Sequence, residues 1–226
     1  MGIALVLLLS AVTFVSLKGG RVLMTLYAVE LGAGPFAAGM LFAVYGLIPA
    51  LFVVRAGRIA DRIGNRVMMY VGFSGFAVSL TLPALFPTLP ALFIASPLIG
   101  FTSMIFIVAS QNLVGVLSLP ETRTRNYSNY SLSDAAGNVA GPVLVGFAID
   151  GLGHGGAYYV LAAIAAACLF IFHFGRGAIP ARSGVTESAP RGPSADLLRL
   201  PALRNALLTN GIVMTGIDLY QVYLPL

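Results

Sequence analysis

Long apolar runs constrain this chain most, because a helix that crosses a bilayer needs about 20 mostly apolar residues. Six such runs precede residue 175, and a seventh begins at residue 205. Only 9% of the residues are charged, whereas soluble domains average about 25%. The sequence therefore predicts an all-α polytopic membrane protein with six transmembrane helices and a partial seventh. The predicted spans are residues 3–29, 36–54 and 67–85, a fourth that ends near 117, then 127–149 and 157–174.

Composition changes after the sixth run and predicts three domains. Residues 1–174 form the predicted transmembrane bundle, and residues 175–204 form a polar connector with five Arg and four Pro, too polar to insert. Residues 205–226 begin a second bundle. Because the seventh run stops at the last residue without a polar tail, we expect a truncated chain whose C-terminal half is missing.

The basic residues predict the orientation. Of 13 Lys and Arg, 11 fall between runs two and three, between runs four and five, or in the connector. Loops rich in Lys and Arg stay in the cytoplasm, so the N-terminus is expected inside. The net charge of +5 does not indicate nucleic acid, because no basic face on a soluble fold accompanies it. We expect a multi-pass protein of the plasma membrane, such as a bacterial inner membrane.

No pattern in the sequence predicts catalysis. His154 and His173 lie far apart and lack acidic, Cys or Ser partners at motif spacing, and Cys168 is the single cysteine. There is no phosphate-binding loop of the kind that holds ATP. We therefore expect no enzymatic activity, no cofactor and no metal site, and any transport would be secondary.

One charged stretch interrupts the apolar pattern, Gly57-Arg-Ile-Ala-Asp61-Arg62-Ile-Gly64-Asn-Arg66. It resembles the loop between the second and third spans of major facilitator superfamily transporters, whose signature is G-x-x-x-D-R-x-G-R-R/K. Asn65 departs from that pattern, since a basic residue is usual there. The resemblance implies the first half of a twelve-helix transporter, with this stretch as a conformational switch. Glu121 is the expected partner of Asp61, Arg62 and Arg66 in a cytoplasmic latch.

Ionisable residues inside a span cost roughly 2.5–3.5 kcal/mol on insertion scales and need a reason. Lys18 and Arg21 lie in the middle of the first span, which lines the central cavity in the family that the chain resembles. They would suit an anionic substrate or an acidic partner such as Asp218. Alternatively, they mark a pause between two shorter segments. The predicted cavity residues are Lys18, Arg21, Thr25, Gln111, Asn112, Asp134, Asn138, Asp218 and Gln221.

For three of these residues, the sequence is compatible with two roles. Asp134 either pairs with Arg123 or Arg125, or exchanges a proton. Gln111 and Asn112 are more often hydrogen-bonding residues between helices than ligands.

A glycine pattern in the fifth span is similar to the Gly-Pro motif of drug/proton antiporters in the same superfamily. Its residues are Gly137, Gly141, Pro142 and Gly146, but the last glycine is one residue late and a terminal Gly-Gly pair is missing. Glycines four apart also simply allow close helix packing. The motif thus predicts either an antiporter or a tight helix contact.

The resemblance implies secondary transport of small organic molecules by alternating access, with ion- or proton-coupled efflux as the first choice. A symporter or uniporter for a small anionic or sugar-like solute is the alternative. A non-transporting scaffold or receptor is the alternative of another class, and charges in mid-span speak against it. Expected partners are the lipid bilayer, a small-molecule substrate and protons, with a monomer at full length.

Overall fold

The computed structural model describes residues 2–179, and beyond them only Asn205, Thr209 and Gly216. At residues 60, 61 and 178 only the backbone is described. The chain divides into two compact units, Met1–Gly184 and Val185–Leu226, and the fold below is that of the first. Most of the predicted seventh span, with Asp218 and Gln221, lies outside the described residues, and the two boundaries between the three predicted domains stay predictions.

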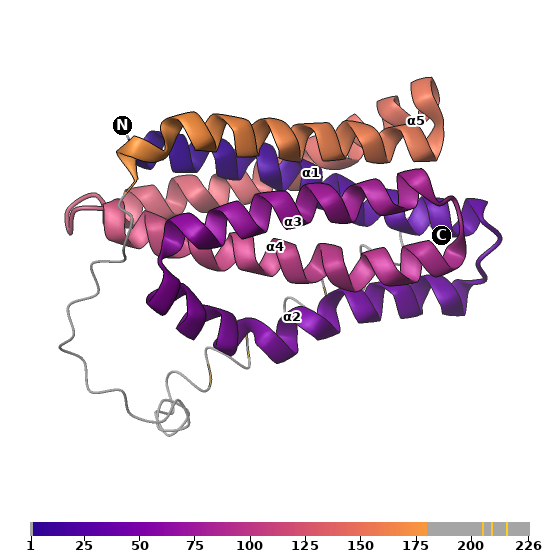
Figure 1. Cartoon of the computed structure of the whole chain (residues 1–226), viewed down its shortest axis with the longest axis horizontal. Coiled ribbons are helices and arrows are strands. Elements are labelled where there is room, and N and C mark those ends of the chain that lie inside the picture. The colour runs from indigo at the N-terminus through magenta and orange to yellow at the C-terminus, as the bar shows by residue number, and fades with distance from the viewer. Residues whose placement is uncertain (1, 180–204, 206–208, 210–215, 217–226) are drawn as a thin grey trace. The chain divides into compact units, whose positions relative to one another are not determined.

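The described residues form helices and no strand, which confirms the all-α fold class (Figure 1). All five long helices are long and apolar enough to cross a membrane. Gly153 breaks the longest helix with φ 72° and ψ 174°, so its two arms (residues 123–152 and 154–175) run as separate spans. Four helices and two arms match the six predicted spans. The elements are α1 (Gly2–Glu30), α2 (Pro35–Ile63), α3 (Asn65–Leu85), α4 (Leu89–Leu117), α5 (Arg123–Gly175) and the 3₁₀ turn η1 (Arg176–Ala178).

The second helix is longer than its predicted span. The prediction ends it at Val54, whereas α2 continues to Ile63. Gly64 alone separates α2 from α3, and its φ of 86° is one that glycine adopts without steric cost. The charged stretch is therefore mostly helix with a one-residue turn. Arg and Ile are compatible with a helix, and charge alone does not end one.

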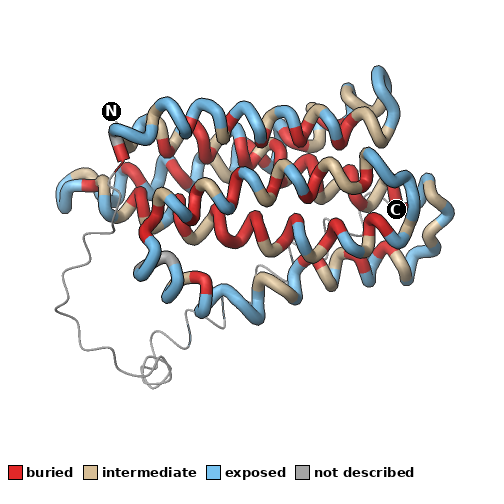
Figure 2. Tube along the Cα trace, in the orientation of Figure 1, coloured by how far each residue is buried: buried red, intermediate tan, exposed pale blue. Residues whose placement is uncertain are grey.

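Each helix packs mainly on one or two neighbours. The closest associations join α1 with α5, α3 with both α4 and α5, and α2 with α4. One apolar cluster includes Phe73, Phe106 and Phe172, and a second includes Leu80 and Tyr158. Figure 2 shows the buried positions on the faces that the helices turn toward one another, with α2 exposed along most of its second half. The core thus lies between α1, α3, α4 and α5.

Candidate functional site

The contact between α1 and the first arm of α5 depends on glycine. A Cβ at Gly141 would lie 2.6 Å from the backbone nitrogen of Gly19 and 2.6 Å from the carbonyl oxygen of Val15. A Cβ at Gly137 would lie 2.8 Å from the Cβ of Phe14. Small residues let helix backbones approach this closely. Two members of the predicted glycine motif therefore hold α5 against α1, whereas Gly146 meets nothing within 4 Å.

This contact brings two charged residues together. Asp134 lies three residues before Gly137 and seven before Gly141, so all three share the face of α5 that meets α1. Lys18 precedes Gly19, and long helical side chains lean back toward the helix N-terminus. The Lys18 Nζ lies 3.0 Å from the Asp134 Oδ1, with the two side chains 17% and 39% exposed. The predicted partners of Asp134 were Arg123 or Arg125, and the structure gives it Lys18.

Arg21 makes a different contact. Its guanidinium carbon lies 4.7 Å from the ring centre of Phe42 and 5.1 Å from that of Tyr45, both on α2. An aromatic face attracts a cation at these distances. Thr25 donates its hydroxyl to the carbonyl oxygen of Arg21 at 3.3 Å, within α1. The two cations of α1 therefore face different helices, Lys18 toward α5 and Arg21 toward α2.

The remaining described cavity candidates lie on α4 and α5. The Asn112 side chain donates to the side-chain oxygen of Asn65 on α3 at 3.1 Å, and Tyr127 donates its hydroxyl to the carbonyl oxygen of Gln111 at 3.2 Å. Both contacts join helices, but only that of Asn112 uses the side chain and agrees with the hydrogen-bonding interpretation. For the Gln111 side chain the two interpretations stay predictions. Asn138 is exposed one turn beyond Asp134. The structure thus brings Lys18, Asp134 and Asn138 to one region, and whether they bind substrate stays a prediction.

A hollow lies beside these α4 contacts. It measures about 380 Å³ and is lined by Asn112, Gly115, Val116, Arg123 and Tyr127. The Arg123 guanidinium donates to the carbonyl oxygen of Gly115 at 3.4 Å, across the turn between α4 and α5. Arg123, one of the two predicted partners of Asp134, therefore makes a hydrogen bond to the backbone of α4 instead.

The predicted conformational switch lies at the junction of α2 and α3. Gly57 and Arg62 are on the last turns of α2, Gly64 is the turn, and Arg66 is on the first turn of α3. The side chain of Asp61 lies outside the described residues, and Glu121 is exposed just before α5, so the predicted latch stays a prediction.

Arg66 makes a contact that the sequence does not predict. Its Nε donates to the carbonyl oxygen of Ile179 at 2.6 Å, and a terminal nitrogen of the same guanidinium donates to the same oxygen. Ile179 follows η1 and is almost fully buried. The start of α3 is therefore bound to the chain that leaves α5. No local pattern could have revealed a partner 113 residues away.

A second contact between ionisable side chains joins the C-terminal end of α1 to the start of the second arm of α5. The His154 Nδ1 lies 2.5 Å from the Glu30 Oε2, and the His154 ring stacks on Tyr27 with centres 5.6 Å apart. No pattern in the sequence paired these two residues. His154 directly follows the break at Gly153, which is the signal that could have located it near a helix end.

The model of the Major Facilitator Superfamily matches residues 6–226 of the chain. The chain belongs to this superfamily. The match confirms the resemblance that the Gly57–Arg66 stretch carries, and it agrees with the helical, membrane-spanning fold. The superfamily is one of transporters, and the chain is accordingly a multi-pass membrane protein.

One relative is named for drug resistance and another for efflux. The tetracycline resistance protein, class D, of Salmonella ordonez is 31% identical over 136 residues, which cover 60% of this chain and 34% of that protein. The multidrug efflux pump LfrA of Mycolicibacterium smegmatis is 27% identical over 120 residues, which cover 53% of this chain and 24% of the relative. The matched region thus spans about a third or less of each relative.

Solved transporters share the fold. A peptide transporter of the POT family in complex with sulfate has a TM-score of 0.74 at 19% identity, covering 99% of this chain and 46% of that one. A POT family transporter in complex with 5-aminolevulinic acid has a TM-score of 0.72 at 19% identity, covering 98% and 47%. At this identity the likeness shows the fold alone.

Proposed function

We propose that the chain forms the first six-helix bundle of a secondary transporter that exports small organic molecules by alternating access, coupled to protons. The superfamily match and the two relatives named for resistance and efflux support this function. Transporters of this kind bind substrate near the bilayer midplane, between two bundles that rock against each other. The Lys18–Asp134 ion pair is the observation that carries the proposal.

The place of this pair is what matters. Lys18 and Asp134 are in the interiors of two membrane-spanning helices, where each charge alone costs several kcal/mol to insert. Pairing offsets part of that cost, but two apolar residues of similar size would pack at lower cost. Because Asp134 also keeps more than a third of its surface exposed, the pair is open to a proton or a charged ligand. A mobile proton on Asp134 would release Lys18 for an anionic group.

We propose that the N-terminus, the α2–α3 turn and the α4–α5 turn face the cytoplasm of a bacterial cell. Exposed Arg58 and Arg62 border the first of these turns, and Arg123 and Arg125 border the second. Basic residues near helix ends set this orientation. On this assignment Glu30 and His154 face outward.

Transport by the full-length protein tests the pair. In everted membrane vesicles with an imposed pH gradient, tetracycline is the probe, because a relative confers resistance to it by name. Asp134→Asn is expected to reduce gradient-driven accumulation at least about tenfold, because it removes the group that exchanges the proton. Lys18→Met is expected to raise the half-saturating concentration of an anionic probe.

Asp150→Asn is the matched control, because Asp150 is also a carboxylate on the first arm of α5 but is exposed near its outer end. It is expected to transport like the wild type. Accumulation that persists after the pH gradient is collapsed would contradict proton coupling. Wild-type transport by Asp134→Asn would remove the ion pair from the mechanism.

A further inference from the structure

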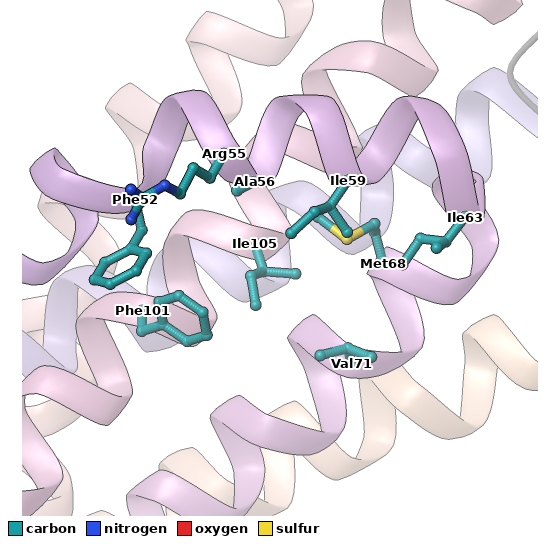
Figure 3. Close-up of a pocket in the computed structure, with 9 residues that line it drawn as sticks. All are labelled: Phe52, Arg55, Ala56, Ile59, Ile63, Met68, Val71, Phe101 and Ile105. Carbon is teal, nitrogen blue, oxygen red and sulfur yellow. The ribbon is translucent and has the colours of Figure 1, made fainter.

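An apolar cavity of about 170 Å³ lies between the second half of α2 and the neighbouring parts of α3 and α4. Figure 3 shows Ile59 of α2, Met68 of α3 and Ile105 of α4 converging on it, with Phe52 and Arg55 at one end and Ile63 at the other. Ile59 and Ile63 are 48% and 44% exposed, so the cavity opens at the surface of the bundle. No residue proposed for transport above lines it.

A basic stripe runs beside this cavity. Arg55, Arg58 and Arg62 are exposed and follow one another at intervals of three and four residues, so they share one face of α2. Ala56, Ile59 and Ile63 lie at the same spacing, one residue further on. The Arg55 guanidinium carbon lies 5.7 Å from the ring centre of Phe52. This contact joins the basic stripe to the apolar residues that line the cavity.

The depth of the cavity fits the inner leaflet. It runs along α2 from Phe52 to Ile63, which is the last residue before the Gly64 turn. With the proposed orientation, Ile63 is at the membrane–cytoplasm boundary and Phe52 is deeper in the hydrocarbon. Arg58 and Arg62 are then near the boundary. The cytoplasmic leaflet carries anionic lipid, which attracts such clusters of basic residues.

We propose that this cavity binds one anionic phospholipid of the cytoplasmic leaflet, with an acyl chain along Ile59 and Ile105 and the phosphate at Arg58 and Arg62. The cavity volume of about 170 Å³ is smaller than the about 300–1,000 Å³ of pockets for drug-sized ligands. It therefore suits a segment of one acyl chain. Arg55 lies at the deeper end of the cavity, where its guanidinium packs on the Phe52 ring and is not part of the proposed phosphate site. The inference uses the proposed orientation but not the proposed transport activity.

Lipid binding by the purified chain tests this site. The probes are phosphatidylglycerol and phosphatidylcholine with identical acyl chains, titrated in detergent and counted by native mass spectrometry. Arg58→Gln/Arg62→Gln is expected to weaken phosphatidylglycerol binding about tenfold and to leave phosphatidylcholine binding unchanged. Ala56→Leu fills the cavity and is expected to weaken binding of both lipids. Ile59→Phe does the same at a half-exposed position, in case Ala56→Leu fails to fold.

Arg123→Gln/Arg125→Gln is the matched control, because it removes two exposed arginines from the same proposed side of the membrane. It is expected to bind phosphatidylglycerol within about twofold of the wild type. An equal loss in both double variants would mean general surface attraction and would overturn the proposal. Wild-type phosphatidylglycerol binding by folded cavity-filling variants would overturn it as well, because no acyl chain would then occupy the cavity.

Discussion

α1 and α2 have the same length and similar hydropathy but different surroundings. Each has 29 residues. In the apolar, membrane-spanning stretch of α1, 44% of the residues are buried inside the bundle, against 17% of the residues in that of α2. α1 contacts α5 through the close approach of Gly19 and Gly141. α2 packs mainly on α4, where a Cβ at Gly100 would lie 2.1 Å from the carbonyl oxygen of Tyr45. Both helices thus have a close glycine contact, and they differ in how much of their surface the bundle covers. Hydropathy identifies a span but does not predict that coverage.

This difference assigns the two helices unequal freedom. α1 is fixed to the core and carries Lys18 to Asp134, whereas the second half of α2 has few neighbours among the described residues and borders the lipid cavity. Elements with few buried contacts open at lower free energy than core elements. α2 is accordingly the helix that can shift while α1 and α5 stay together.

The largest effect is expected from Gly141→Leu. Its side chain would meet the backbones of Gly19 and Val15, and backbone atoms cannot give way as a flexible side chain can. We expect the free energy of unfolding to fall by about 3 kcal/mol or more, at the upper end for overpacked cores. Thermal unfolding in detergent measures this change.

Gly146→Leu is the control, because a Cβ at Gly146 meets nothing within 4 Å on the same arm of α5. It is expected to unfold close to the wild-type temperature. If the two variants unfold together, the glycine contact does not hold α1, and the contrast with α2 fails.

Gly100→Ala is expected to have a smaller and more local effect. The added methyl group pushes on the carbonyl oxygen of Tyr45 and loosens α2 from α4, at a cost of about 1–3 kcal/mol. Amide hydrogen exchange is expected to rise in α2 and to stay unchanged in α1 and the first arm of α5. Exchange that rises equally in all three would show that α2 is as integral to the core as α1.

Gly46→Ala gives the matched change on the other helix. A Cβ there meets nothing within 4 Å, and alanine favours a helix over glycine by about 0.5–1 kcal/mol. Exchange in α2 is therefore expected to slow slightly or stay the same.

The smallest effect is expected from His154→Gln. The Glu30 side chain is 51% exposed, and solvent screening limits exposed ion pairs to about 0–1 kcal/mol. Thermal unfolding of His154→Gln, Glu30→Gln and the double variant measures the coupling between the two side chains. A loss as large as that of Gly141→Leu would mean that the outer ends, and not the glycine contact, hold α1 to α5.

Most of the fold could be predicted from the sequence, because a helix that crosses a bilayer must be apolar over about 20 residues. Apolar length alone located the six spans, and the Gly57–Arg66 stretch identified the superfamily. Helix ends were less predictable: α2 runs on to Ile63 because its charged residues tolerate a helix, and only Gly64 interrupts the backbone.

The charged residues of the candidate site stand out in the sequence, but their contacts do not. Lys18, Arg21 and Asp134 are recognisable because charge is rare in a span. Which of them pair depends on the rotation of α5 against α1, which Gly137 and Gly141 fix across more than 110 residues of chain. No local pattern distinguishes Lys18 from Arg123 as the partner of Asp134.

The Arg66–Ile179 contact has a mechanical consequence. The carbonyl of Ile179 lies directly after η1, and Arg66 binds it from the first turn of α3. A displacement of Ile179 would therefore reach the one-residue turn at Gly64 through this guanidinium. This contact thus couples the C-terminal end of α5 to the turn at the base of α2, two parts of the bundle that are far apart in the sequence.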